Sequence, residues 1–206
     1  MIKIGGSILT SAKAYRRAAL FVCNRHRAAP WENLVVVVSA QEGATDRLER
    51  AAREIVREPD ARALDLLWAT GELRSVALLA LHLQALGVSA AALNAHEAGL
   101  QVSAVSDGPV RESGRVSLHA RWSRTALTEH PVAVVPGFFA TDPAGTILSL
   151  GRGGAVRTSA GRAVARGACT GEPYHCYAGG NTVARSCSVR RCRALREIYD
   201  EGIFLI

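Results

Sequence analysis

Lysine is the charged residue that this sequence has least of. Of its 25 lysines and arginines, only Lys3 and Lys13 are lysines. The arginine guanidinium is a rigid planar fork, whereas the lysine ammonium is a compact point charge. An arginine therefore does not easily replace a lysine that neutralises a transferring phosphoryl group. If the chain handles phosphate, that role falls first on Lys3.

The sequence also lacks a secretion signal and a long apolar run. Residues 1–6 do not show the basic, apolar and small-residue segments that mark a signal peptide. The most apolar stretch, residues 76–93, is interrupted by polar side chains and a glycine. It is expected to be a buried helix followed by a strand, because a membrane span needs a longer apolar run. We therefore expect a cytoplasmic protein with no membrane partner.

Cysteine is scarce in the body of the chain, where Cys23 stands alone. The other four lie near His175, at Cys169, Cys176, Cys187 and Cys192. They could suggest zinc, but they form no CxxC pair and lack the paired knuckles of structural zinc sites. Disulfides are not expected in the cytosol. We interpret these residues as incidental thiols and predict no protein-held metal; a cysteine-rich binding module over residues 155–206 is a remoter alternative.

The positive charge of the chain is unevenly distributed. The formal net charge is +7, and the last quarter contains eight arginines against four acidic residues. This basic tail shows no RNA-binding aromatic motif, zinc-finger spacing or basic heptad pattern. We therefore predict no nucleic-acid partner.

Hydrophobic periodicity predicts strands alternating with helices. Residues 31–39 are centred on five consecutive apolar residues from Leu34 to Val38, which is typical of a parallel strand covered on both faces. Further strands are expected at residues 2–4, 88–93, 102–105 and 131–135, and helices at 12–27, 45–57, 61–86 and 192–199. Gly87 is expected to end the third helix, and residues 142–146 to form a hairpin turn. Alternating strands and helices imply an α/β fold with a mainly parallel sheet.

Two glycine-rich segments are candidates for ligand binding. After a strand, Lys3 is followed by Gly5, Gly6 and Ser7, where bare backbone N–H groups can approach an anion. The alternative is a tight turn with a solvated lysine, because neither a P-loop ending nor a full GxGxxG follows. The second segment, Gly151–Gly154, contains Arg152, whose guanidinium suits a carboxylate, although a flexible glycine hairpin fits the same residues.

A third candidate lies inside the predicted helix at residues 61–86. Thr70-Gly71-Glu72 places a glycine where it costs about 1 kcal/mol relative to alanine. Such a glycine usually has a packing or functional reason.

Together these motifs resemble the amino-acid kinase superfamily, and in detail the aspartate kinases. The resemblance covers residues 1–154. It rests on ordered matches at Lys3 to Ser7, Val36 to Ala40, Gly43 to Leu48, Thr70 to Glu72 with Ser75, Gly87-Val88, Ala98-Gly99, Gly137-Phe138 and Leu150 to Gly154. It implies a three-layer αβα sandwich with an incomplete nucleotide lobe. The substrate and phosphoryl lobe would span residues 1–154, and residues 155–206 would be a divergent or truncated remainder.

The resemblance also implies a reaction, in which ATP with Mg²⁺ phosphorylates the β-carboxylate of aspartate in amino-acid biosynthesis. Lys3 would be the catalytic residue that neutralises the transferring phosphoryl group. The phosphate- and nucleotide-binding residues would be Gly5, Gly6, Ser7, Gly153 and Gly154. Aspartate would be held by Ser39, Thr45, Glu72 and Arg152, with Glu72 facing the α-ammonium and Arg152 a carboxylate. Such chemistry depends mainly on positioning and charge neutralisation. A homo-oligomer is a further partner that the resemblance allows.

The chain departs from the family pattern directly after Gly154. Ala155 and Val156 stand where the resemblance implies serine and a catalytic aspartate. The family's nucleotide-pocket segment is also missing beyond Thr158. These departures predict weak or absent turnover. The alternative function is a non-catalytic relative that binds an amino acid or a partner subunit.

Overall fold

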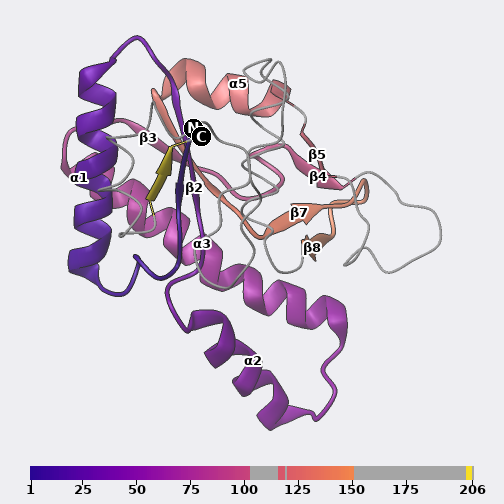
Figure 1. Ribbon diagram of the computed structural model, residues 1–206. Coiled ribbons are helices and arrows are strands. Elements are labelled where there is room, and N and C mark those ends of the chain that lie inside the picture. Colours follow the sequence, from indigo (N-terminus) through magenta and orange to yellow (C-terminus); the bar gives the residue numbers. More distant parts are fainter. Residues whose placement is uncertain (103–115, 119, 151–202, 206) are drawn as a thin grey trace, which may run out of the picture.

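The computed structural model of the chain describes residues 1–102, 116–118, 120–150 and 203–205 (Figure 1). Its helices are α1 (Ala12–Ala28), α2 (Ala44–Ile55), α3 (Ala61–Ala85) and α5 (Ala120–Glu129). Its strands are β1 (Ile2–Ile4), β2 (Leu34–Val38), β3 (Ala90–Ala92), β4 (Leu100–Val102), β5 (Val116–Leu118), β6 (Val132–Pro136), β7 (Phe139–Thr141), β8 (Ile147–Ser149) and β9 (Ile203–Leu205).

The main sheet is mostly parallel, as the sequence predicts. Its strand order is β3-β6-β2-β1-β9, and the pairings β3–β6, β6–β2 and β2–β1 are all parallel. In the centre, Val36 of β2 lies opposite Ile2 of β1 and Val134 of β6. All five β2 side chains are buried, because this strand has neighbours on both sides and layers above and below.

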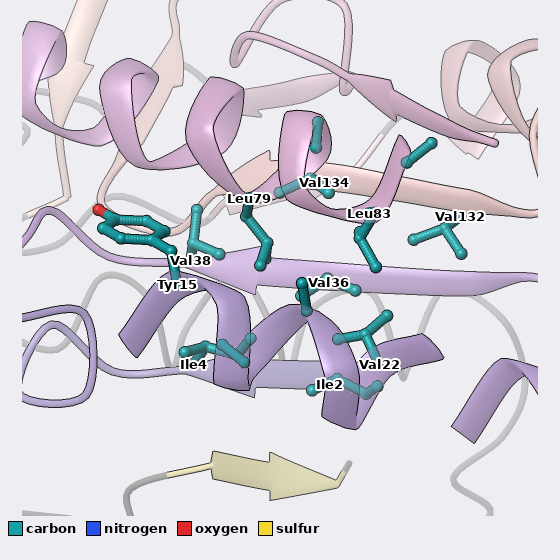
Figure 2. Close-up of a cluster of buried hydrophobic side chains, with 14 of the residues drawn as sticks. Ile2, Ile4, Tyr15, Val22, Val36, Val38, Leu79, Leu83, Val132 and Val134 are labelled. Atoms are coloured by element: carbon teal, nitrogen blue, oxygen red, sulfur yellow. The ribbon is translucent and has the colours of Figure 1, made fainter. Parts of the chain in front are cut away.

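Alternate side chains of the sheet enter two separate cores. Val36 and Val38 point into a cluster shared with α1 and α3, which Figure 2 shows around Tyr15, Leu79 and Leu83. Val35 and Val37 point the other way, into a cluster that includes Leu127 of α5 and residues of the second sheet. The period of two along β2 thus separates the layers of a three-layer αβα sandwich, which confirms the predicted fold class.

The second, smaller sheet has the order β5-β4-β7-β8. Strands β7 and β8 form an antiparallel hairpin, as predicted, and its turn is closed where the Thr146 N–H donates to Asp142 Oδ1 (2.7 Å). Local sequence patterns did not predict β5, β9 or α5. Of the strand expected at residues 102–105, Val102 is the last residue of β4, and the rest lies outside the described residues. The short strands depend on partners far away in the sequence, which a local pattern does not reveal.

Helix α3 is the long helix of the core. It begins after Asp60, whose Oδ2 accepts from the Ala63 N–H (2.9 Å), and it ends before Gly87 with φ +76°, as predicted. Within the described ranges it is the one helix long and apolar enough to span a membrane by length and composition. Its contacts with α1, α2 and the sheets instead make it a core helix, and it buries Asp65 and Glu72.

Candidate functional site

Three neighbouring parallel strands deliver loops to the same edge of the main sheet. Strand β1 continues into Gly5-Gly6, β2 into Ser39-Ala40 and β6 into Gly137-Phe138. The ladder between β1 and β2 extends by one bond, from the Ser39 N–H to the Ile4 carbonyl (3.2 Å). Open α/β sheets bind ligands at the carboxyl ends of their strands. This edge is therefore the candidate site.

The Glu72 carboxylate joins two of these loops. Its Oε1 accepts from the Ala40 N–H (3.2 Å), which follows β2. Its Oε2 accepts from the Gly137 and Phe138 N–H groups (2.8 and 2.9 Å), which follow β6. Glu72 is only 3% exposed, so these bonds offset the cost of burying a charged group. One side chain from α3 thus fixes the spacing of two strand ends.

Burial and hydrogen bonding shift the pKa of Glu72 in opposite directions. Burial raises the pKa of Glu72 to about 7, because the interior disfavours the charged form. The N–H groups of Phe138, Gly137 and Ala40 and the positive charge of Lys3 lower it, but by less in sum. A carboxyl group that titrates near neutrality can respond to a cation placed beside it.

The glycine loop after β1 lies directly against the Ala40 backbone. A Cβ at Gly6 would lie 2.4 Å from the Ala40 carbonyl oxygen, so no larger residue fits there without a backbone shift. The Gly5 and Gly6 carbonyls accept from the Ile8 and Leu9 N–H groups (3.2 and 3.0 Å), which closes a tight turn. Gly6 is therefore required by a close approach of two loops, and the same bare backbone suits a phosphate group.

Comparison with known proteins places this arrangement in a family. The sequence profile described as the amino acid kinase family matches residues 1–170. The chain belongs to the amino acid kinase family. This match extends past residue 154, where the resemblance based on sequence motifs ends.

Aspartokinases are among the proteins to which the chain is similar. The chain is 36% identical to the aspartokinase of Thermus thermophilus over 172 residues, which are 84% of this chain and 41% of that protein. It is 32% identical to the aspartokinase of Geobacillus stearothermophilus over 205 residues, 98% of this chain and 48% of that protein. The chain thus spans less than half the length of these curated relatives.

Solved structures agree with the fold. The aspartate kinase from Synechocystis aligns with a TM-score of 0.63 and 28% identity, over 80% of this chain and 26% of that one. E. coli aspartokinase III in complex with aspartate and ADP aligns with a TM-score of 0.57 over 80% of this chain and 46% of that one. At 20% identity, this second likeness concerns the fold alone.

Several residues predicted from the family resemblance lie around the same edge. Lys3 is half-buried in β1, and its charge acts on Glu72. Ser39 is half-buried beside Ala40, and Ser7 is exposed in the glycine loop. Thr45 lies in the first turn of α2, next to Ala44. The Cβ of Ala44 is 3.9 Å from the point where a Cβ added to Gly71 would lie. The roles predicted for these residues stay predictions.

The rest of the predicted site lies outside the described residues. This applies to Arg152, Gly153 and Gly154, to Val156, and to the predicted helix at residues 192–199. The expected closeness of Glu72 and Arg152 is therefore still a prediction, although Glu72 points inward, as that prediction requires.

Sequence reasoning did not single out two buried polar side chains of the core. The first is Tyr15, whose hydroxyl is 2.7 Å from Ser75 Oγ, while Ser75 Oγ donates to the Gly71 carbonyl (3.4 Å). This buried chain ties α1 to the turn of α3 that carries Glu72. Burial raises the pKa of Tyr15, so it stays a neutral donor. The second is Asp65, a buried acid seven residues before Glu72, a spacing that could have revealed a shared helix face.

The family resemblance implies two ligands, a phosphate group and Mg²⁺, and the described residues do not fit both equally. Gly5, Gly6 and Lys3 fit a phosphate group, because they combine bare N–H groups, a close backbone approach and a cation. For a metal, no cluster of three or more His, Cys, Asp or Glu side chains occurs among residues 1–102 and 125–150. Magnesium in such enzymes commonly uses one or two carboxylates together with substrate phosphates.

Proposed function

We propose that this chain carries the amino-acid-binding half of an aspartokinase site, in which ATP phosphorylates the β-carboxylate of aspartate. The observation that supports this most is the Glu72 carboxylate, which is buried where the β2 and β6 loops meet, beside Lys3 and the Gly5-Gly6 turn. A cytoplasmic location and an assembly of identical chains belong to the same proposal, by analogy with the family.

Glu72 is suited to hold an ammonium group. An ionised carboxylate offers about four lone-pair positions. The described backbone N–H groups use three of them. An amino-acid ammonium would complete the set, and its charge would stabilise the ionised form of Glu72. Thr45 and Arg152 would contact the rest of the substrate, and Ser39 would lie beside it.

At the other end of the site, Lys3 would face the transferred phosphoryl group. Its ammonium would offset the developing negative charge, while the N–H groups of Gly5, Gly6 and Ser7 would hold the phosphate oxygens. When bound, ATP with Mg²⁺ supplies the phosphoryl group and part of its charge neutralisation. Gly153 and Gly154 are proposed to approach the nucleotide.

A second candidate function is amino-acid binding without catalysis. The observation that favours it is Val156, which cannot organise phosphates or a metal as the expected aspartate would. Both candidates share the aspartate site and differ only in turnover.

Calorimetric titration with aspartate, combined with hydroxylamine trapping of acyl phosphate, tests both candidates. Glu72→Ala is expected to lower aspartate affinity by about tenfold or more, because it removes a charge-assisted contact and releases two loops. The matched control is Glu97→Ala, since Glu97 Oε2 also accepts a backbone N–H, from Asn94 (2.9 Å), but at an exposed position. Aspartate binding without acyl phosphate would select the non-catalytic candidate. No aspartate binding by the unaltered chain would refute both.

A further inference from the structure

Helix α3 buries a second carboxylate on the same side as Glu72. Asp65 is 4% exposed and lies seven residues before Glu72. With about 3.6 residues per turn, seven residues make about two turns, so both side chains leave the same face of the helix. Neither position belongs to the exposed surface, where acidic side chains normally lie.

Asp65 holds the end of the second sheet. Its Oδ2 accepts from the N–H of Ser149 (3.2 Å), the last residue of β8, which is itself 3% exposed. The next residue, Leu150, donates its N–H to the Phe138 carbonyl (2.8 Å). Asp65 thus fixes the end of β8, and the Leu150 N–H that follows this end donates to Phe138.

The Phe138 residue is therefore held on two sides. Its N–H donates to Glu72 Oε2 (2.9 Å), and its carbonyl accepts from Leu150. The contacts form a closed circuit that starts on α3 at Asp65, passes through Ser149, Leu150 and Phe138, and returns to α3 at Glu72. Because its N–H partners are held in place, the Glu72 carboxylate has a fixed orientation, and its remaining lone pair points in a defined direction.

We propose that Asp65 is a positioning residue that orients the Phe138 loop, and through it Glu72, toward the amino-acid ligand. The proposal rests on the proposed function for its ligand readout. The β8 end is directly followed in the sequence by Gly151, so Asp65 also fixes the point from which the chain continues. Asp65 itself touches no substrate in this scheme.

The test uses three variants of the full chain. Asp65→Ala removes the acceptor, and Asp65→Asn keeps an acceptor of the same shape without the charge. Asp60→Ala is the matched control, because Asp60 on the same helix also accepts a backbone N–H, that of Ala63, but at its exposed start. The readouts are residue-resolved amide hydrogen exchange and calorimetric titration with aspartate.

In Asp65→Ala, exchange of the Ser149 and Leu150 amides is expected to accelerate by about tenfold or more relative to amides in β2, because a bond to a charged acceptor is lost. Aspartate affinity should fall by about tenfold in the same variant. Asp65→Asn should keep most of the amide protection and most of the aspartate affinity. Asp60→Ala should not selectively change the exchange of these two amides or the affinity for aspartate.

Two results would overturn the proposal. One is unchanged exchange of Leu150 in Asp65→Ala, or acceleration spread evenly over the whole chain. The other is accelerated exchange at Leu150 with unaltered aspartate affinity. If the unaltered chain binds no aspartate, the proposed function and the ligand role of Asp65 both fail. The exchange pattern then still shows whether Asp65 holds the Phe138 loop.

Discussion

At the scale of single residues, the chemistry of this chain centres on a buried acid. Glu72 satisfies three backbone N–H groups from two loops, and its burial outweighs their effect on its pKa. The same side chain is thus a structural tie and a titratable group near neutral pH. Both properties lead to measurable expectations.

We expect the stability of the chain to fall as the pH rises through the titration of Glu72. Its folded pKa of about 7 lies above the unfolded value of 4.5, so the folded state binds the proton more tightly. The tighter proton binding adds about 3 kcal/mol to the free energy of unfolding. This stabilisation is fully present below about pH 4.5 and is lost as the pH rises to about 7. Urea unfolding at several pH values measures it.

Glu72→Gln should remove this pH dependence, because glutamine does not titrate. Glu97→Gln should leave the dependence in place and serves as the control. An equal slope between pH 4.5 and 7 in the Glu72→Gln variant would show that another group is responsible.

Two glycines that face Ala40 are expected to respond oppositely to replacement by alanine. A Cβ at Gly6 would lie 2.4 Å from the Ala40 carbonyl oxygen, so Gly6→Ala should cost about 1–3 kcal/mol or more. A Cβ at Gly71 would lie 3.4 Å from Ala40 Cβ, an ordinary contact, within a helix. Gly71→Ala should therefore be neutral or raise the free energy of unfolding by up to about 1 kcal/mol. Denaturant unfolding compares the two; a strongly destabilised Gly71→Ala would contradict the packing described.

At the scale of elements, α3 is the organising helix of the described structure. It contacts α1, α2 and both sheets, and its buried polar side chains reach backbone groups or side chains of each neighbouring layer. Gly71 faces Leu48 and Ala44 of α2 without interrupting α3, and a Cβ there would lie in ordinary contact with both. Polar bonds of this kind specify how the layers align, in addition to the apolar packing.

The tie between α1 and α3 should show an asymmetric response to mutation. Tyr15→Phe removes the hydroxyl but leaves Ser75 bonded to the Gly71 carbonyl, so it should cost about 1 kcal/mol. Ser75→Ala leaves the buried Tyr15 hydroxyl without that partner and should cost more, about 1–3 kcal/mol. Unfolding of both single variants and the double variant measures the coupling. If the two residues are directly bonded, the double variant should lose less free energy of unfolding than the two single variants lose in sum. A loss equal to that sum or larger would contradict a direct bond.

At the scale of the whole molecule, distant parts of the chain meet in one sheet. Strand β9, near the carboxyl terminus, pairs antiparallel with β1 and places the two ends of the chain side by side (Figure 1). It covers the β1 edge, whose free backbone groups would otherwise be available for pairing with another chain. The chain also spans less than half of the aspartokinases it matches, so catalysis has to be tested directly.

We expect the chain as it stands to produce little acyl phosphate. Loss of a group that organises phosphates commonly costs several powers of ten in rate, and Val156 stands at that position in the family pattern. Hydroxylamine trapping with ATP, Mg²⁺ and aspartate measures the product. Val156→Asp alone should restore activity only in part, because the family resemblance implies that the nucleotide segment is missing as well. Turnover close to that of a full-length aspartokinase would contradict this expectation.

The main elements of the fold were predictable because their signals are local. The apolar run at Leu34–Val38, the helical spacing after Asp60 and the glycine at position 87 each determine nearby backbone geometry. The ordered motifs from Lys3 to Gly154 were likewise sufficient to recognise the family. Short elements such as β9 were missed, because three residues take their structure from a partner strand.

By itself, the sequence determined the α/β class, the family and the identity of the candidate side chains. Only the tertiary structure decided what Glu72 and Asp65 do, because their partners are backbone N–H groups 32 to 84 positions away. A backbone amide has no identity in the sequence, so no motif marks it as the partner of a carboxylate. Those contacts exist only once the strand ends meet at one edge of the sheet.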